Sequence, residues 1–283
     1  MVNNLEIQPS WFVSQLRQGF NAVQFSKAVA DIRRGWERRD LWGMLGIHEI
    51  RQRYRRSVIG PFWITISMGV MVAALGLLYG KIFKLALDDY LPYLAAGFIV
   101  WGLISSLILD ATHVFTSVEG LIRQLAAPLS IYVYKAVWTN LIIFFHNIWI
   151  LLLVAFWFGI NPGWGILLVI PALLILMLNG LWVGLFLGLI SARFRDIPLI
   201  IASVVQVMFF ITPVIWKPSM LPGRALFLDL NPFYHFVAIL RDPLLGQAPQ
   251  LNNWIAAILI TLVGWAMALF FYTGYRWRLT YWV

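Results

Sequence analysis

The chain contains no cysteine and few charged residues, and both scarcities narrow what it can be. Without cysteine it has no disulfide, no thiolate metal site and no cysteine nucleophile. Asp, Glu, Lys and Arg make up 12% of its 283 residues, whereas they make up about a quarter of a soluble domain. Hydrophobic residues reach 61%. This composition is typical of an integral membrane protein, whose apolar surface is covered by lipid and by neighbouring helices.

Motifs of common enzymes are also missing. The sequence has no phosphate-binding Gly-x-x-x-x-Gly-Lys loop, no His-Glu-x-x-His motif and no Gly-x-Ser-x-Gly motif. Asp110, His113 and His146 are the few ionisable residues expected at membrane depth. We therefore expect no enzymatic activity, no metal and no cofactor on this chain. If nucleotide powers its activity, the ATPase must be another chain.

Long uncharged runs predict six transmembrane helices. Ser57–Gly80 is uncharged for 24 residues and Tyr90–Leu109 for 20, and about 20 residues cross roughly 30 Å of hydrocarbon. Ala136–Ala192 is uncharged for 57 residues, but the Asn-Pro-Gly turn at Asn161–Gly165 divides it. The predicted fold is therefore an all-α integral membrane protein. Its spans are expected at about 61–83, 92–115, 131–159, 165–191, 197–216 and 252–273.

Lys and Arg predict the orientation of these spans. The formal net charge is +9, and ten of the 21 Lys and Arg residues lie in residues 1–60. Six more fall on the same side of the predicted spans and five on the other. The positive-inside rule then places both termini in the cytosol, with residues 1–40 as a cytosolic arm and 41–283 as the transmembrane domain. Charge of this kind flanks a membrane, so we expect no nucleic-acid partner.

A basic amphipathic helix over 41–58 is predicted before the first span. Such a helix lies in the headgroup layer of a membrane. It would either anchor the chain to anionic lipid or act as a movable helix that docks a partner or guards a cytosolic entrance. The residues that share its apolar face are Ile47, Ile50, Tyr54 and Val58.

Two further segments are predicted between spans. Residues 118–128 form a short cytosolic helix bracketed by Gly120 and Pro128, either an ordinary connector or a peg for a cytosolic subunit. Residues 218–245 form an external segment rich in proline, yet too apolar for a plain aqueous loop. A pair of re-entrant helices at an outer mouth fits this composition better, because irregular backbone at membrane depth must be covered by protein or line a cavity.

Aromatic residues make up 16% of the chain, and most are expected in belts at the membrane surfaces. Some are candidates to line a pore, because flat aromatic faces stack on sugar rings without requiring one sugar sequence. The candidates are Trp63, Tyr79, Phe83, Trp101, Phe209, Phe210, Trp216, Phe233 and Tyr234.

From about residue 40 onward, the order of motifs resembles the permease subunit of ABC transporters that export O-antigen, capsule or teichoic acid chains. The motifs of the first half are Arg51-x-Arg53-Tyr54-Arg55-Arg56-Ser57-x-Ile59-Gly60-Pro61-x-Trp63, Ala96-Gly97-x-x-x-Trp101, and Leu121-Ile122-Arg123 followed by Pro128. Those of the second half are Arg195-Asp196-Ile197-Pro198, Phe210-x-x-Pro213-Val214, Asn231-Pro232 and Leu240-Arg241. Gly120, Ala127 and Ser67-Met68-Gly69 depart from that family's pattern.

The resemblance implies a homodimer in the bacterial inner membrane, with two copies of a cytosolic ATP-binding subunit that hold ATP and Mg²⁺. A glycan on polyprenyl diphosphate would cross a channel at the dimer interface, lined mainly by the first and fifth spans. Coupling to the ATPase would use Leu121, Ile122, Arg123, Gln124 and Pro128. Membrane lipids would contact the interfacial helix, where guanidinium groups recognise phosphate and are expected to guide the lipid diphosphate. The residues of that helix are Ile47, Arg51, Arg53, Tyr54, Arg55 and Arg56.

Two other functions stay open at this point. A related ABC exporter of drugs or small lipids would share the membrane fold, although the aromatic density favours a polymer. A membrane enzyme that modifies lipid-linked sugars would need ionisable groups in one pocket, of which this chain offers few.

Overall fold

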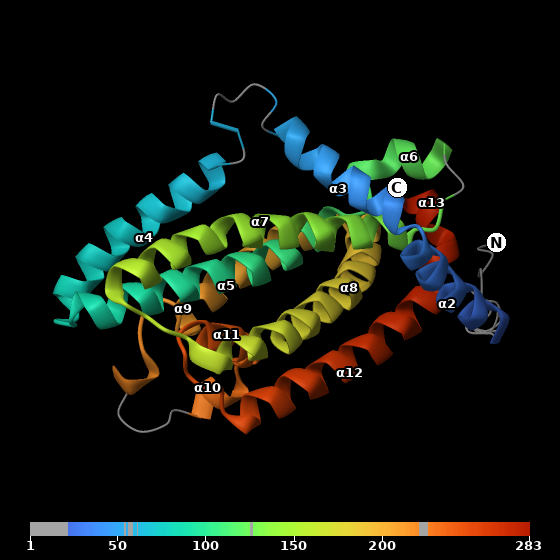
Figure 1. Ribbon diagram of the computed structural model, residues 1–283. Helices are drawn as coiled ribbons and strands as arrows, with labels where there is room; N and C mark the ends of the chain where they lie inside the picture. The colour runs from blue at the N-terminus through green and yellow to red at the C-terminus, as the bar shows by residue number, and fades with distance from the viewer. Residues whose placement is uncertain (1–21, 54, 56–58, 61, 125–126, 221–225) are drawn as a thin grey trace, which may run out of the picture.

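The computed structural model describes residues 22–53, 55, 59–60, 62–124, 127–220 and 226–283. Every regular element in these ranges is a helix (Figure 1). Five helices are long and apolar enough to cross a membrane. They are α4 (Phe62–Ile82), α5 (Leu87–His113), α7 (Ser130–Phe158), α8 (Val169–Arg193) with the preceding 3-10 helix η2 (Gly163–Leu168), and α12 (Leu251–Tyr275). The predicted all-helical, multi-pass architecture is therefore confirmed.

The fifth predicted span corresponds to α9 (Ile197–Ile211), which has only 15 residues. An α-helix rises 1.5 Å per residue, so α9 covers about 22 Å. It ends where Pro213 disfavours the helical conformation of the residue before it, and Thr212 is extended with φ −79° and ψ 137°. Five of the described helices are long and apolar enough to cross a membrane, so they do not establish the predicted count of six spans.

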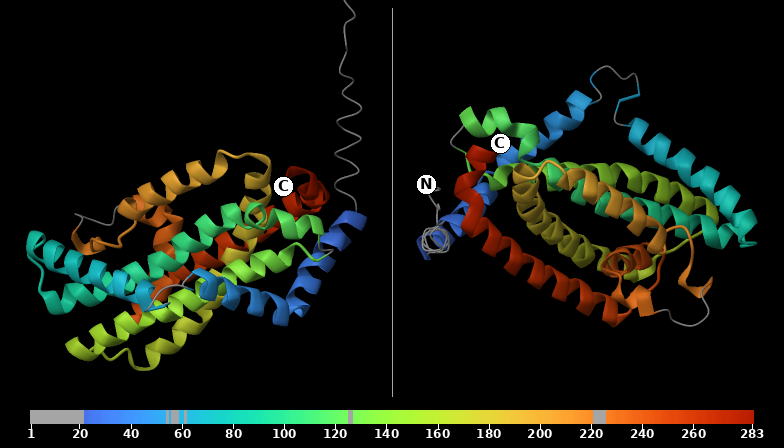
Figure 2. Two further views of the ribbon diagram at one scale, coloured as in Figure 1. Left: turned by 90° about the horizontal axis from the view of Figure 1, so that it is seen from above. Right: turned by 180° about the vertical axis from the view of Figure 1, so that it is seen from behind.

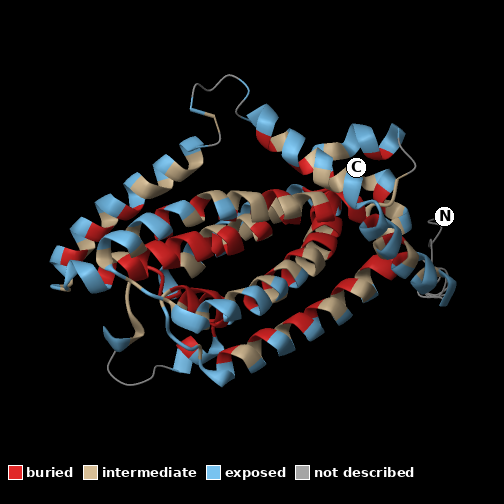
Figure 3. Ribbon diagram, viewed as in Figure 1, coloured by how far each residue is buried: buried red, intermediate tan, exposed pale blue. Residues whose placement is uncertain are grey.

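α5 is the central helix of the bundle. Its residues from Tyr90 to Trp101 are almost continuously buried (Figure 3). It packs against α4, α7, α8 and α9, and also against α11 (Pro232–Leu244). In contrast, α4 and α9 each touch the bundle along one narrow face. The bundle therefore has a well-covered centre and two thinly covered spans at its edges.

A stripe of glycines on α8 allows close packing on α5 and α7. A Cβ added to Gly180 would lie 2.9 Å from Leu107 of α5, and one added to Gly184 would lie 2.5 Å from Val133 of α7. Gly188 is equally close to Val114, just after α5. Small residues spaced by four are the usual means of close helix approach in membranes, where no hydrophobic effect drives the helices together.

Short helices gather at one end of the bundle (Figures 1 and 2). They are α2 (Ala22–Glu37), α3 (Arg39–Arg53), α6 (Glu119–Gln124) and α13 (Leu279–Trp282). We call this the α6 end. The 3-10 helix η4 (Arg276–Arg278) lies there too, between α12 and α13. Residues 22–37, predicted only as part of an arm, thus form a helix that packs on α7 and α12.

The opposite end carries α10 (Leu226–Leu230) and α11. The break predicted at Asn161–Gly165 is present at this end, because α7 ends at Phe158 and Gly159 takes a left-handed φ of 68°. α11 is seen nearly end-on in Figure 1, so it lies across the spans rather than along them. Its 13 residues are mostly buried among α5, α8 and α12.

Candidate functional site

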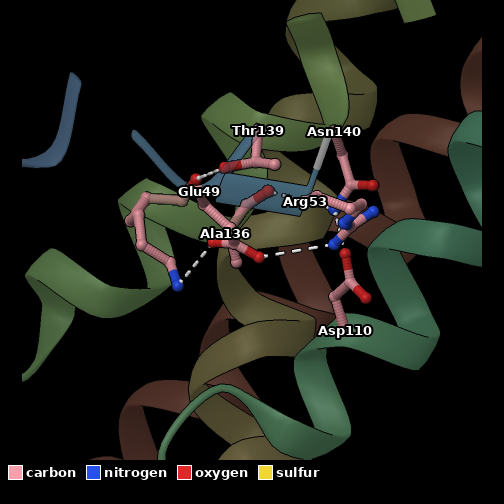
Figure 4. Close-up of polar contacts among 7 residues, drawn as sticks. Glu49, Arg53, Asp110, Ala136, Thr139 and Asn140 are labelled. Carbon is pink, nitrogen blue, oxygen red and sulfur yellow. Dashed lines mark hydrogen bonds and ion pairs between the residues drawn. The ribbon is translucent and has the colours of Figure 1, made fainter. Parts of the chain in front are cut away.

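α3 is tied to the bundle by a chain of polar contacts at the α6 end (Figure 4). Lys135 Nζ of α7 lies 2.8 Å from Glu49 Oε2, and Arg53 lies 3.4 Å from the other oxygen of Glu49. On the next turn of α7, Asn140 Nδ2 donates to Asp110 Oδ2 of α5 at 2.8 Å. Polar contacts therefore connect α3 to α7 and α7 to α5.

The predicted apolar face of α3 is divided in the structure. Ile50 is 7% exposed and packs inward, whereas Ile47 is 42% exposed. Arg51, Arg53 and Arg55 are all exposed. Tyr54 and Arg56 lie outside the described residues, as does Val58. α3 thus presents basic side chains outward and holds to α7 through the face that carries Ile50.

α6 is held to the bundle by one buried side chain and one arginine. Ile122 is 6% exposed, whereas Leu121 is 41% exposed and Gln124 is also exposed. Arg123 lies 2.7 Å from Glu119 and donates from Nε to the Val283 carbonyl at 3.2 Å. Pro128 is half-buried just before α7. Within the described part of the chain, Leu121 and Gln124 therefore form an outward surface of α6 that could contact another molecule.

Asp31 on α2 joins three helices, and sequence reasoning missed it. Its carboxylate accepts hydrogen bonds from the backbone N–H groups of Leu129 and Ser130 at the start of α7, at 3.2 and 3.1 Å. It also accepts from Tyr272 Oη of α12 at 2.8 Å, and forms an ion pair with Arg276 at 3.1 Å. An acidic residue at the start of a helix satisfies free N–H groups and the helix dipole. The partners lie 98 or more positions away, so no local pattern could have indicated this role.

At the opposite end, Arg241 of α11 lies in a buried polar cluster. It is 4% exposed and donates from one Nη to the Tyr93 hydroxyl and to the Pro213 carbonyl, both at 2.8 Å. Its guanidinium also stacks over the Tyr93 ring at 4.4 Å. Burial raises the pKa of the neighbouring Asp242 carboxyl, and Arg241 opposes that rise. The Pro213 and Arg241 motifs, far apart in sequence, thus meet in space.

A second contact holds the same region together. Asn231 Nδ2 donates to Thr212 Oγ1 at 3.0 Å, and Asn231 Oδ1 accepts from the Phe233 N–H at 2.9 Å as the N-cap of α11. His235 bridges Asn253 of α12 and the Asp229 carbonyl. α11 is therefore fixed by polar contacts at both of its ends.

The candidate aromatics do not line one common cavity. Phe209 and Phe233 both pack against Trp101, with ring centres 5.7 and 5.6 Å away. Tyr79 and Phe83 stack on each other at the end of α4. The remaining candidates point outward or make local contacts: Trp63 and Phe210 are exposed, Trp216 Nε1 donates to the Phe210 carbonyl, and Tyr234 packs beside His235.

The ionisable residues expected at membrane depth have separate partners. Asp110 accepts from Asn140, whereas His146 bonds to the Ile142 carbonyl of its own helix. An apolar cavity of about 210 Å³ lies between α5, α8 and α11, and Asn179 is the polar residue at its wall. The described residues contain no cluster suited to a metal ion.

Comparison with known proteins identifies the family. The ABC-2 type transporter family matches residues 41–245. The O-antigen export system permease protein RfbA of Myxococcus xanthus is 24% identical over 246 residues, which cover 84% of this chain and 94% of the relative. Two proteins of the same name from Klebsiella pneumoniae are 19% and 21% identical, covering 80% and 81% of this chain and 89% and 90% of the relatives. The chain belongs to the ABC-2 type transporter family and is a multi-pass membrane permease.

Proposed function

We propose that this chain is the channel-forming membrane subunit of an ATP-driven exporter. Its substrate is a lipid-linked polysaccharide of the O-antigen type, moved from the cytosolic to the outer side of the bacterial inner membrane. The observation that carries this proposal is the nearly end-to-end match to relatives named for O-antigen export. The fold supports it, because a bundle of long apolar helices suits transport across a membrane.

The proposed topology has six spans, with α9 as the fifth and both termini in the cytosol. The unequal distribution of Lys and Arg supports this orientation. α9 would complete its crossing with residues 212–216, which follow it as turns and bends. α10 and α11 would form the re-entrant segment at the outer mouth, where Arg241 and Asn231 hold them against α5 and α9.

The channel is proposed to form between two copies of the chain. In one copy, α9 buries only Val205, and α4 buries only Val72, Gly76 and Gly80. Facing copies would cover these helices, and the exposed Trp63 and Phe210 would then be positioned to stack on sugar rings.

ATP and Mg²⁺ are proposed to bind two copies of a separate subunit that contacts α6. Family membership supports such a partner, because ABC transporters are powered by ATP-binding subunits. The outward surface of α6, with Leu121 and Gln124, supports docking at this place. Movement there would reach α3 and α5 through Lys135 and Asn140 of α7.

The arginines of α3 and of the segment that follows it are proposed to guide the lipid diphosphate, since guanidinium binds phosphate with two parallel hydrogen bonds. Replacement of Arg51, Arg53, Arg55 and Arg56 with glutamine should impair export and leave assembly with the ATPase intact. Unchanged export in the quadruple variant would exclude this role.

Deletion of the gene tests the main proposal. Lipid-linked glycan should accumulate on the cytosolic side while surface polymer disappears, and the intact gene should restore it. Normal surface glycan with new sensitivity to small toxic molecules would instead indicate a drug exporter. Loss of the polymer itself, or of one modification on it, would indicate an enzyme.

A further inference from the structure

A pocket of about 450 Å³ lies at the α6 end between the last turns of α8 and α12. It is separate from the contacts of α3 and from the apolar cavity near α11. Its wall combines two arginines with apolar and aromatic side chains. The residues that matter here are Ile190, Arg193, Phe271, Tyr275, Arg278 and Trp282.

Arg193 is held in this pocket by aromatic rings rather than by an acid. Its guanidinium carbon lies 5.7 Å from the centre of the Trp282 ring. Within the described part of the chain, no carboxylate comes within ion-pair distance of Arg193, and no acceptor is hydrogen-bonded to it. The nearby Arg276 differs, because it is paired with Asp31 at 3.1 Å. The five N–H donors of Arg193 are therefore available to a ligand.

Arg278 brings a second positive charge to the same pocket. Its guanidinium stacks over Trp277 and Tyr275, with 4.7 and 5.9 Å between the guanidinium carbon and the ring centres. Two guanidinium groups that line one pocket favour a phosphate, which they can bind with charge-assisted hydrogen bonds.

The apolar part of the lining lies deeper along α8 and α12. Ile190 is almost one turn before Arg193 on α8, and Phe271 is one turn before Tyr275 on α12. Both helices belong to candidate membrane spans that end at this level. A free phosphate would gain nothing from such a wall, whereas the acyl chains of a lipid would. Basic pockets between transmembrane helices at a membrane surface are suited to anionic headgroups.

We propose that this pocket binds an anionic phospholipid, with its phosphate on Arg193 and Arg278 and its acyl chains along Ile190 and Phe271. The bound lipid would join α8 to η4 and α13. α13 leads directly to Val283, whose carbonyl accepts from Arg123 of α6. The lipid would thus stabilise the C-terminal segment that contacts α6, independently of the substrate that the protein exports.

Native mass spectrometry of the full-length chain in detergent tests this site. Wild-type protein should retain phosphatidylglycerol in preference to phosphatidylcholine with the same acyl chains. The double variant Arg193→Gln/Arg278→Gln should hold one phosphatidylglycerol fewer and bind it at least about tenfold more weakly. Arg195→Gln is the matched control, because Arg195 is exposed, lies two residues away and does not line the pocket; it should bind like wild type.

Three results would overturn the proposal: equal retention of phosphatidylglycerol by the double variant, equal binding of the two lipids, or equal loss in Arg195→Gln. A thermal-unfolding series with inorganic phosphate alone separates the two sources of phosphate. Stabilisation by inorganic phosphate equal to that by lipid would assign the site to a free anion. If the double variant does not fold, Arg193→Gln and Arg193→Lys are compared instead, and only the glutamine variant should lose binding.

Discussion

Asp31 and Arg241 are charged side chains buried at opposite ends of the bundle. Each is satisfied by residues far away in sequence: Asp31 accepts hydrogen bonds from α7 and α12, and Arg241 donates to Tyr93 and Pro213. A buried charge that loses its partners costs more than an exposed one, because water cannot replace them. Single substitutions at these two residues should therefore weaken the fold.

Asp31→Asn should lower the free energy of unfolding by about 2 kcal/mol, since hydrogen bonds to a charged group contribute roughly 1.5–3 kcal/mol. Thermal unfolding in detergent measures the effect. Asp40→Asn is the control, because Asp40 is exposed on α3. Equal stability of the two variants would show that Asp31 does not hold α2 in place.

Arg241→Leu should destabilise the protein by about 3 kcal/mol, because it removes the bonds to Tyr93 and Pro213 and leaves the partly buried Asp242 carboxylate without its partner. The double variant Arg241→Leu/Asp242→Asn should recover part of this loss, because the orphaned charge is gone. Unfolding of the single and double variants gives the coupling between the two residues. Purely additive effects would contradict an Arg241–Asp242 interaction.

At the scale of helices, the fold depends on where side chains are small. The glycine stripe of α8 faces α5 and α7, while α6 is attached mainly by Ile122 and Arg123. The contact of α8 with α5 and α7 is close and runs along the helix, whereas α6 has few attachments to the bundle. We expect α8 to be intolerant of added atoms and α6 to tolerate changes on its outward surface.

Gly184→Ala should destabilise the protein by roughly 1–3 kcal/mol, because the new Cβ would overlap Val133. Val133→Ala should relieve most of that effect in the double variant. Gly120→Ala is a control, since nothing lies within 4 Å of its added Cβ. Unfolding temperatures of the wild type, the two single variants and the double variant measure the coupling between Gly184 and Val133. A double variant no more stable than Gly184→Ala would refute close packing as the cause.

Two neighbouring residues of α6 should differ in their effects. Ile122→Ser should lower the free energy of unfolding by about 2 kcal/mol, because Ile122 is buried. Leu121→Ser should leave stability unchanged but weaken binding of the ATP-binding subunit and export. Co-purification and thermal unfolding separate the two outcomes, and normal binding by Leu121→Ser would place the docking surface elsewhere.

At the scale of the whole molecule, α4 and α9 lack neighbours on most of their surface. The exposed side chains of α9 include Leu199, Val204 and Val207. Lipid covers such residues in any membrane helix, so their exposure alone does not define an interface. The proposed homodimer gives a specific prediction, because it places α9 of one copy beside the other copy.

Because the native chain has no cysteine, cross-linking can test this arrangement directly. Val207→Cys should form disulfide-linked dimers in native membranes under mild oxidation. Val263→Cys on α12 is the matched control, because Val263 is 67% exposed against 56% for Val207 but lies on a helix outside the proposed interface. Equal cross-linking at both positions, or none at Val207, would argue against a channel lined by α9.

Local patterns predicted the membrane part of the fold well. Uncharged runs located the long helices, and the Asn-Pro-Gly turn located the break before Gly163. It was harder to predict the roles of residues 22–37 and of α11, since these depend on contacts with distant helices. Ile47 and Ile50 show the same limit, because spacing placed both on one face but only packing against α7 buried Ile50.

The sequence by itself determined the class of this protein. Hydrophobic length and charge scarcity require a multi-pass helical membrane protein, because lipid cannot satisfy exposed backbone polar groups. The order of its motifs indicated the exporter family. Only the tertiary structure decided that Asp31 holds α2, α7 and α12 together, that Pro213 meets Arg241, and that Arg193 and Arg278 share a pocket. The physical reason is that these contacts join residues from separate helices, and their distances arise only when the helices pack.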